Sequence, residues 1–148
     1  MKYDDASWHY GGDFPKNLPN EAGATHIGMF LAWMLLNGFA SEELVEDAEE
    51  EIGSLKKRSI TGASFLIEVL DEKLTDNDFN DDGNAFAKAY YEGKDNDSRY
   101  IDDYFEAFGV NVKSLYEVPD TWENYEKLST RVGERFSKWN SDGRPEYI

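Results

Sequence analysis

The longest apolar run in the chain extends from Ile27 to Leu36. Its apolar residues fill most of the circumference of a helix, so the pattern predicts a helix that occupies the centre of the fold. We expect this helix to span Glu21 to about Asn37. Asn20 is placed to cap its start and Gly38 to end it. A membrane-spanning helix needs about 20 apolar residues, so this run predicts a buried core helix.

Further helices are predicted wherever apolar residues recur at intervals of three and four behind a capping residue. The predicted ranges are 42–58 after the cap Ser41, about 61–74, 85–91, 98–108 and a last helix capped by Asp120, whose apolar stripe runs from Trp122 to Trp139. Residues 75–83 predict a polar loop, and periodicity leaves residues 110–118 open between strand and loop. With no internal repeat and no linker, the chain predicts one all-α domain over residues 1–148, a bundle of five or six helices.

The two ends of the chain have a different pattern. Residues 1–19 contain two glycines and two prolines, which predict an extended arm rather than a long helix. The arm carries five large side chains that we expect to pack on the core: Tyr3, Trp8, Tyr10, Phe14 and Leu18. Residues 140–148 are predicted to form a polar tail.

Composition narrows the possible functions. The chain has 22 aromatic residues and is 40% hydrophobic, so it can form a core despite its formal charge of −16. This charge argues against nucleic-acid binding, because phosphate contacts need clustered Lys and Arg. The absence of Cys excludes disulfides and thiolate metal sites. No targeting or membrane segment is apparent at the N-terminus, so we expect a cytoplasmic protein.

Most of the negative charge is concentrated in residues 42–106, which contain 20 acidic and 7 basic residues. An acidic face of this kind favours a basic partner, although a purely solvating acidic surface explains the same composition. The acidic residues expected to contact a partner are Glu46, Glu49, Glu50, Asp78, Asp81, Asp82, Asp95 and Asp97, with Tyr91 and Tyr100 as aromatic anchors. Tyr90 and Tyr104 belong to the same aromatic group, most of which we expect in the core.

The last predicted helix carries a basic stripe of Lys127, Arg131, Arg135 and Lys138. Glutamates are interspersed along the same helix and are spaced to form favourable pairs with these basic residues, for example Glu134 with Lys138. The stripe either docks on the acidic helices or faces water. The glutamates favour a mixed, solvated face, to which we assign no ligand.

One carboxylate pattern suggests an enzyme. Glu43 and Glu46 lie one helical turn apart on one predicted helix, and Glu68 and Asp71 do so on the next. The pattern resembles that of all-α nucleoside-triphosphate pyrophosphohydrolases of the MazG and dimeric dUTPase type, which implies carboxylates that hold magnesium against a phosphate chain. A chain with 31 acidic residues also produces such spacings by chance.

The segment from Asp78 to Gly83 resembles the first half of an EF-hand calcium loop, with Asn80 and Asp82 at alternate positions. The twelfth position, where a bidentate Glu should complete the coordination, is Ala89. We therefore expect a solvated loop that caps the following helix and not a calcium site.

The two histidines, His9 and His26, could share a metal with Asp4, Asp5 or Asp13, but they have no fixed ligand spacing. A core His26 that hydrogen-bonds the N-terminal arm through Asp4 or Asp5 is the favoured interpretation. No catalytic residue, metal or cofactor is predicted, apart from magnesium under the pyrophosphohydrolase alternative.

Several stretches together resemble a family signature. They are Tyr-Asp-Asp-Ala-Ser-Trp-His at residues 3–9, Phe14-Pro15, His-Ile-Gly at residues 26–28, Phe-Leu-Ala-Trp at residues 30–33 and Asp-Thr-Trp-Glu-Asn-Tyr at residues 120–125. They resemble an uncharacterised family of small acidic bacterial proteins that is loosely associated with immunity partners in toxin systems. The resemblance implies no catalytic residue.

The leading hypothesis is an immunity protein that covers the active site of a basic toxin, such as a nuclease, with the acidic face of residues 42–106. The alternative is the magnesium-dependent pyrophosphohydrolase. A structural or regulatory helical domain without an acidic binding site is a third possibility. Oligomeric state is left open.

Overall fold

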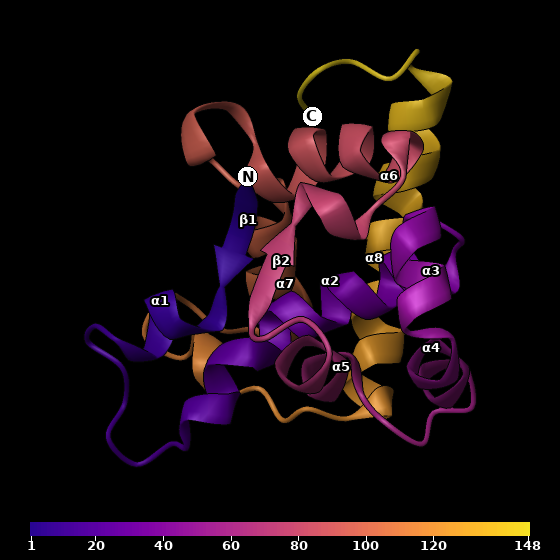
Figure 1. The fold of residues 1–148 in the computed structure, drawn as a ribbon. Coiled ribbons are helices and arrows are strands. Elements are labelled where there is room, and N and C mark those ends of the chain that lie inside the picture. The colour runs from indigo at the N-terminus through magenta and orange to yellow at the C-terminus, as the bar shows by residue number, and fades with distance from the viewer.

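Helix α2 (Thr25–Leu36) lies at the centre of the structure, a computed structural model that describes residues 1–148 (Figure 1). Every residue from Thr25 to Leu35 is buried, which confirms the predicted central core helix. The helix begins four residues later than expected, because residues Asn20–Ala24 form a tighter 3₁₀ turn, η1. This turn has no side-chain cap, so the predicted capping role of Asn20 is wrong.

The remaining helices surround α2. They are α3 (Glu42–Asp47), α4 (Glu49–Lys56), α5 (Gly62–Glu68), α6 (Asp81–Phe86), the π-helical segment η3 (Ala87–Glu92), α7 (Arg99–Phe108) and α8 (Trp122–Ser141). Short 3₁₀ turns lie at Asp76–Asp78 (η2), Lys94–Asn96 (η4) and Leu115–Glu117 (η5). The all-α class and the single bundle are confirmed, and no helix is both long enough and apolar enough to span a bilayer.

The structure has eight α-helices rather than five or six. The predicted helix over residues 42–58 divides at Ala48, whose backbone leaves the helical region with φ −127° and ψ 33°. The predicted helix over residues 61–74 ends at Glu68. Asp71 and Glu72 then take positive φ, which turns the chain into strand β2 (Lys73–Thr75). Local breaks of this kind leave the apolar spacing of the sequence unchanged, so periodicity did not show them.

The N-terminal arm is only partly extended. Strand β1 (Lys2–Asp5) pairs antiparallel with β2, and the chain then forms helix α1 (Ala6–Tyr10). The Asp5 side chain caps this helix by accepting a hydrogen bond from the backbone N–H of Ser7. Tyr3 and Tyr10 pack against the core as expected. Trp8 does not, because it lies on the outer face of α1 and is 57% exposed.

Helices α2 and α5 touch through their backbones. A Cβ atom on Gly28 would overlap the backbone at Ala63, and one on Gly62 would overlap the carbonyl of Gly28. The helices can approach this closely only because both contact positions are glycine, which has no side chain. The contact brings Phe65 and Leu66 of α5 into the core, where both are fully buried.

Helix α8 is fixed to α7 by an ion pair between the fully buried Asp103 and the partly exposed Arg135. The Arg135 guanidinium donates to both carboxylate oxygens of Asp103, at 2.8 and 2.9 Å, and the Tyr90 hydroxyl donates to the same carboxylate at 2.7 Å. Arg131 pairs with Glu106 one turn away. The predicted solvated basic face is therefore wrong for these two arginines, because acidic residues of α7 lie directly opposite them. Lys127 and Lys138 do face solvent.

The C-terminal segment turns back onto the bundle (Figure 1). Helix α8 is capped by Thr121 rather than Asp120 and extends to Ser141. The Trp139 indole then donates to the carbonyl of Pro145 at 2.8 Å, and the Ile148 N–H donates to the carbonyl of Ala89 at 3.2 Å. The predicted polar tail is thus shorter than expected and is packed on η3.

Replacing Gly28 by Ala should lower the free energy of unfolding by about 2 kcal/mol or more, because the new methyl group overlaps backbone that cannot rotate away. Gly53→Ala is the matched control, since a Cβ there meets nothing within 4 Å in the interior of α4. That variant should be more stable than wild type by about 0.5–1 kcal/mol. Urea unfolding measures both values, and effects of the same sign would contradict the backbone contact.

Replacing Arg135 by Met should destabilise the protein by about 2 kcal/mol, because the fully buried Asp103 carboxylate loses two charged hydrogen bonds and keeps only the Arg131 guanidinium at 4.0 Å as an ion-pair partner. Lys138→Met removes a cation from the same helix, where it pairs with Asp142 at an exposed site. This control should cost less than about 1 kcal/mol. Comparable losses in urea unfolding for the two variants would contradict the assignment of Arg135 as the residue that fixes α8.

Candidate functional site

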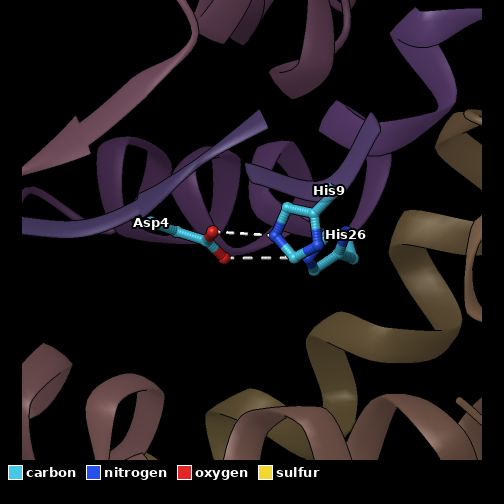
Figure 2. Close-up of side chains that lie close together, drawn as sticks. All are labelled: Asp4, His9 and His26. Carbon is cyan, nitrogen blue, oxygen red and sulfur yellow. Dashed lines mark hydrogen bonds and ion pairs between the residues drawn. The ribbon is translucent and has the colours of Figure 1, made fainter. Parts of the chain in front are cut away.

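Three potential metal ligands lie together where the N-terminal arm meets α2 (Figure 2). They are Asp4 of β1, His9 of α1 and His26 in the first turn of α2, and one ligand atom from each lies within 4.8 Å of the others. Asp4 and His26 are buried, and the His9 side chain is 21% exposed. We call these three residues the Asp-His-His cluster. It is the one place in the structure where at least three His, Asp or Glu side chains converge in this way.

Local structure brings the cluster together. Pairing of Asp4 with Leu74 fixes the position of β1 beside β2. The Asp5 cap then starts α1 immediately, and one turn of this helix carries His9 back over α2. The His9 and His26 rings meet edge to face, with centroids 4.5 Å apart.

Hydrogen bonds hold the Asp4 carboxylate from several sides. Its Oδ1 accepts the backbone N–H of Asp5 at 2.8 Å and lies 2.8 Å from Nε2 of His9. Its Oδ2 accepts the Tyr91 hydroxyl at 2.5 Å. The other ring nitrogen of His9, Nδ1, lies 2.7 Å from the Tyr116 hydroxyl. His9 is therefore held at both nitrogens, between a carboxylate and a phenol.

His26 differs from His9. Its Nε2 is fully buried and has no hydrogen-bond partner, and Oδ2 of Asp4 lies 3.7 Å away, beyond hydrogen-bond distance. The Tyr100 hydroxyl donates to the backbone carbonyl of His26 at 2.5 Å, which fixes the backbone but not the ring. The cluster thus contains one buried ring nitrogen, Nε2 of His26, that has no hydrogen-bond partner.

Burial and charge set the protonation states around Asp4. Burial works to raise the pKa of the Asp4 carboxyl, but its contacts with His26 and His9 together hold that pKa well below its usual range. Burial lowers the pKa of His26, an effect that Asp4 partly opposes. Burial raises the pKa of Tyr91, with Asp4 adding to the effect. At neutral pH these shifts favour an ionised Asp4, a neutral His26 and a protonated Tyr91.

The sequence predicted part of this cluster. A buried His26 close to Asp4 is confirmed, but the short hydrogen bond to Asp4 comes from His9. Asp13 is exposed and Asp5 caps α1, so neither joins the cluster. Tyr91 and Tyr116 were not associated with the histidines, because they lie 65 or more positions further along the chain.

The acidic residues do not form one face. Glu46, Glu49 and Glu50 are exposed on α3 and α4, on the right in Figure 1. Asp95 and Asp97 are exposed in the loop around η4, on the opposite side of the same view. Asp81 and Asp82 are exposed at the start of α6, and Asp82 pairs with Arg144.

Three of the residues predicted to contact a partner are buried: Asp78, Tyr91 and Tyr100. Asp78 is turned inward, where its carboxylate accepts the backbone N–H of Thr75 at 2.8 Å. The tyrosines pack with Phe30 in the aromatic core. Their predicted role as surface anchors is therefore wrong, because the central helix requires large side chains to cover it.

The carboxylates of the pyrophosphohydrolase pattern do not converge. Glu43 and Glu46 are exposed on α3. Glu68 is the last residue of α5, and Asp71 lies beyond the helix end, where it pairs with Lys73. The helical spacing that suggested a shared face for Glu68 and Asp71 is thus absent.

The segment that resembles an EF-hand also directs its side chains apart. Asp78 bonds Thr75, Asp82 pairs with Arg144, and Asn80 caps α6 by accepting the N–H of Gly83. The predicted cap on the following helix is confirmed, but that helix begins at Asp81 rather than at residue 85. The loop is not fully solvated, because Asp78 and Phe79 are buried.

Comparison with protein families gives one match. Residues 2–118 match a family described as a domain of unknown function (DUF7832). The chain belongs to the DUF7832 family. No curated protein and no solved structure matches the chain. The DUF7832 match includes the whole Asp-His-His cluster with Tyr91 and Tyr116, whereas α8 lies outside it.

Asp78 should make stability depend on pH between about 4 and 6. Burial raises its pKa to about 6, an effect that the Thr75 hydrogen bonds partly oppose. The folded protein therefore binds a proton that the unfolded chain releases, so this contribution is present at low pH and is lost as pH rises through 6. Asp78→Asn keeps an acceptor for Thr75 but removes the titration.

Relative to Asp78→Asn, wild type should gain on the order of 1 kcal/mol in free energy of unfolding when the pH falls from 7 to 5. Urea unfolding at both pH values measures this difference. Asp97→Asn, at an exposed position, is the control and should show no such gain. A difference between wild type and Asp78→Asn that does not change with pH would contradict the burial of a titrating Asp78.

Proposed function

We propose that this protein is an acidic binding protein whose partner is a basic protein, and specifically that it acts as an immunity protein that covers the active site of a basic toxin. The binding surface is the exposed acidic surface of α3 and α4. It consists of Glu42, Glu43, Glu46, Asp47, Glu49, Glu50 and Glu51, and we call it the α3–α4 acidic surface.

The observation that carries the proposal is that none of these seven carboxylates forms an ion pair. Lysines and arginines elsewhere pair with acids along the rest of the chain, for example Arg58 with Glu126 and Lys88 with Glu146. Residues 42–51 contain no basic residue of their own. Concentrating like charges costs self-repulsion, which a basic partner would relieve.

The α3–α4 acidic surface also has apolar features that a partner side chain could contact. Val45 is 46% exposed among the carboxylates. A separate groove of about 300 Å³ is lined by Glu43 and Asp47 of α3 and by Val69 and Leu70 after α5. A Lys or Arg side chain fits such a groove, since its aliphatic part packs on apolar walls while its charge reaches a carboxylate.

The immunity role comes from the resemblance to small acidic bacterial proteins associated with toxin systems, and a cytoplasmic location is part of the same proposal. The physics of inhibition suits such a surface. Negative charge speeds association with a positive cleft by steering, and contacts in the groove slow dissociation.

The proposal is tested by capture of a basic polypeptide from the native cells with tagged protein at low salt. Glu49→Lys combined with Glu50→Lys should abolish capture and slow association with the purified partner by about tenfold or more, because steering depends on the charge at the contact. Stopped-flow or surface binding measurements at two salt concentrations give the association rate.

Asp95→Lys combined with Asp97→Lys is the matched control, because it changes the net charge equally on the opposite side of the molecule (Figure 1). This variant should retain capture, with only the small loss of rate that follows from net charge. Equal losses for both pairs, or an affinity insensitive to salt, would contradict a binding site on α3 and α4.

A further inference from the structure

Nε2 of His26 is a buried polar atom without a hydrogen-bond partner, and the fold offers no group that satisfies it. This nitrogen is completely enclosed, and Oδ2 of Asp4 lies 3.7 Å away. A buried polar atom without a partner is unfavourable, and native proteins rarely retain one without a function. The gap between this nitrogen and the carboxylate is where a third group would satisfy both.

The donor set around that gap is characteristic of metal binding. Two imidazoles and one carboxylate are ligands that Zn²⁺ and related divalent transition metals prefer. The three residues come from β1, α1 and α2, and their ligand atoms already lie within 4.8 Å of one another. Ligands placed about 2 Å from a common ion are about 3.3 Å apart, so shifts on the order of 1 Å complete the geometry.

The surroundings of the cluster supply the second set of contacts that metal ligands usually have. When Nδ1 of His9 carries the proton and donates it to the Tyr116 hydroxyl, 2.7 Å away, Nε2 has a lone pair for an ion that replaces its 2.8 Å contact with Oδ1 of Asp4. Oδ2 of Asp4 accepts from Tyr91, and Oδ1 accepts from the backbone of Asp5. These contacts orient the ligands without occupying the nitrogen of His26.

We propose that Asp4, His9 and His26 bind one divalent transition-metal ion of the Zn²⁺ type. The ion lies between the Asp4 carboxylate and the two Nε2 atoms and enters past the partly exposed ring of His9. Bound there, it ties the N-terminal arm to the central helix. This proposal does not depend on the function proposed for α3 and α4, and it departs from the sequence-based expectation that the chain holds no metal.

The test uses the full chain, treated with a chelator and then titrated with Zn²⁺. Isothermal titration calorimetry should give one ion per chain, and the melting temperature should rise with Zn²⁺ concentration. His9 and His26 are the only histidines, so their ring nitrogen signals in NMR report the site directly. Both should change at one equivalent, with His9 moving its proton to Nδ1 as Nε2 becomes a ligand.

Variants separate the cluster from the acidic surface. His9→Gln should abolish the stoichiometric binding, and its circular dichroism spectrum shows whether the fold is kept. Tyr116→Phe leaves all three ligands in place and should weaken binding by about 10-fold to 100-fold, because it removes the group that orients His9. Glu49→Gln combined with Glu50→Gln should leave binding unchanged.

Several outcomes would overturn the proposal. They are the absence of saturable binding in wild type, histidine signals that do not respond to Zn²⁺, and binding that survives in folded His9→Gln. Loss of binding in the Glu49 and Glu50 variant would assign the ion to the exposed acids instead. None of these results would affect the capture experiment, so the two proposals fail independently.

Discussion

Helix α2 has no polar, solvent-exposed face, and the other elements of the structure surround it on all sides. Its backbone meets α5 directly at Gly28 and Gly62, which leaves no room for a side chain between the two helices. Aromatic rings cover another side, where Phe30 packs against Tyr91 and Tyr100. The N-terminal arm covers the start of the helix, at His26. This demand for apolar cover explains why so acidic a chain retains a large aromatic core.

Two buried carboxylates fix the ends of the chain to this core, and both depend on the short π-helical segment η3. Tyr90 donates to Asp103, which in turn holds Arg135 of α8. The next residue, Tyr91, donates to Asp4 of the arm. Adjacent tyrosines therefore support the C-terminal helix and the N-terminal strand. Buried charges of this kind fix geometry more than they add stability, because removal from water offsets much of their attraction.

The acids divide into an inner and an outer group with different physics. Asp4 and Asp103 are enclosed and hydrogen-bonded, so their positions are fixed by the fold. The carboxylates of α3 and α4 are exposed and unpaired, so solvent and salt screen them until a partner excludes water. The proposed metal site belongs to the first group and the proposed protein-binding surface to the second.

The sequence by itself determined the all-α class, the central helix, the overall charge and a capping loop before α6, because apolar periodicity, composition and short-range capping are local properties. It also predicted a buried His26 near Asp4. Only the tertiary structure decided that His9, Tyr91 and Tyr116 surround that pair, that Tyr100 is core rather than surface, and that Arg135 meets Asp103. These contacts join residues far apart in the chain. The position of Asp4 also depends on a local break, the positive φ at Asp71 and Glu72 that leads into β2, and such a break leaves the hydrophobic pattern unchanged.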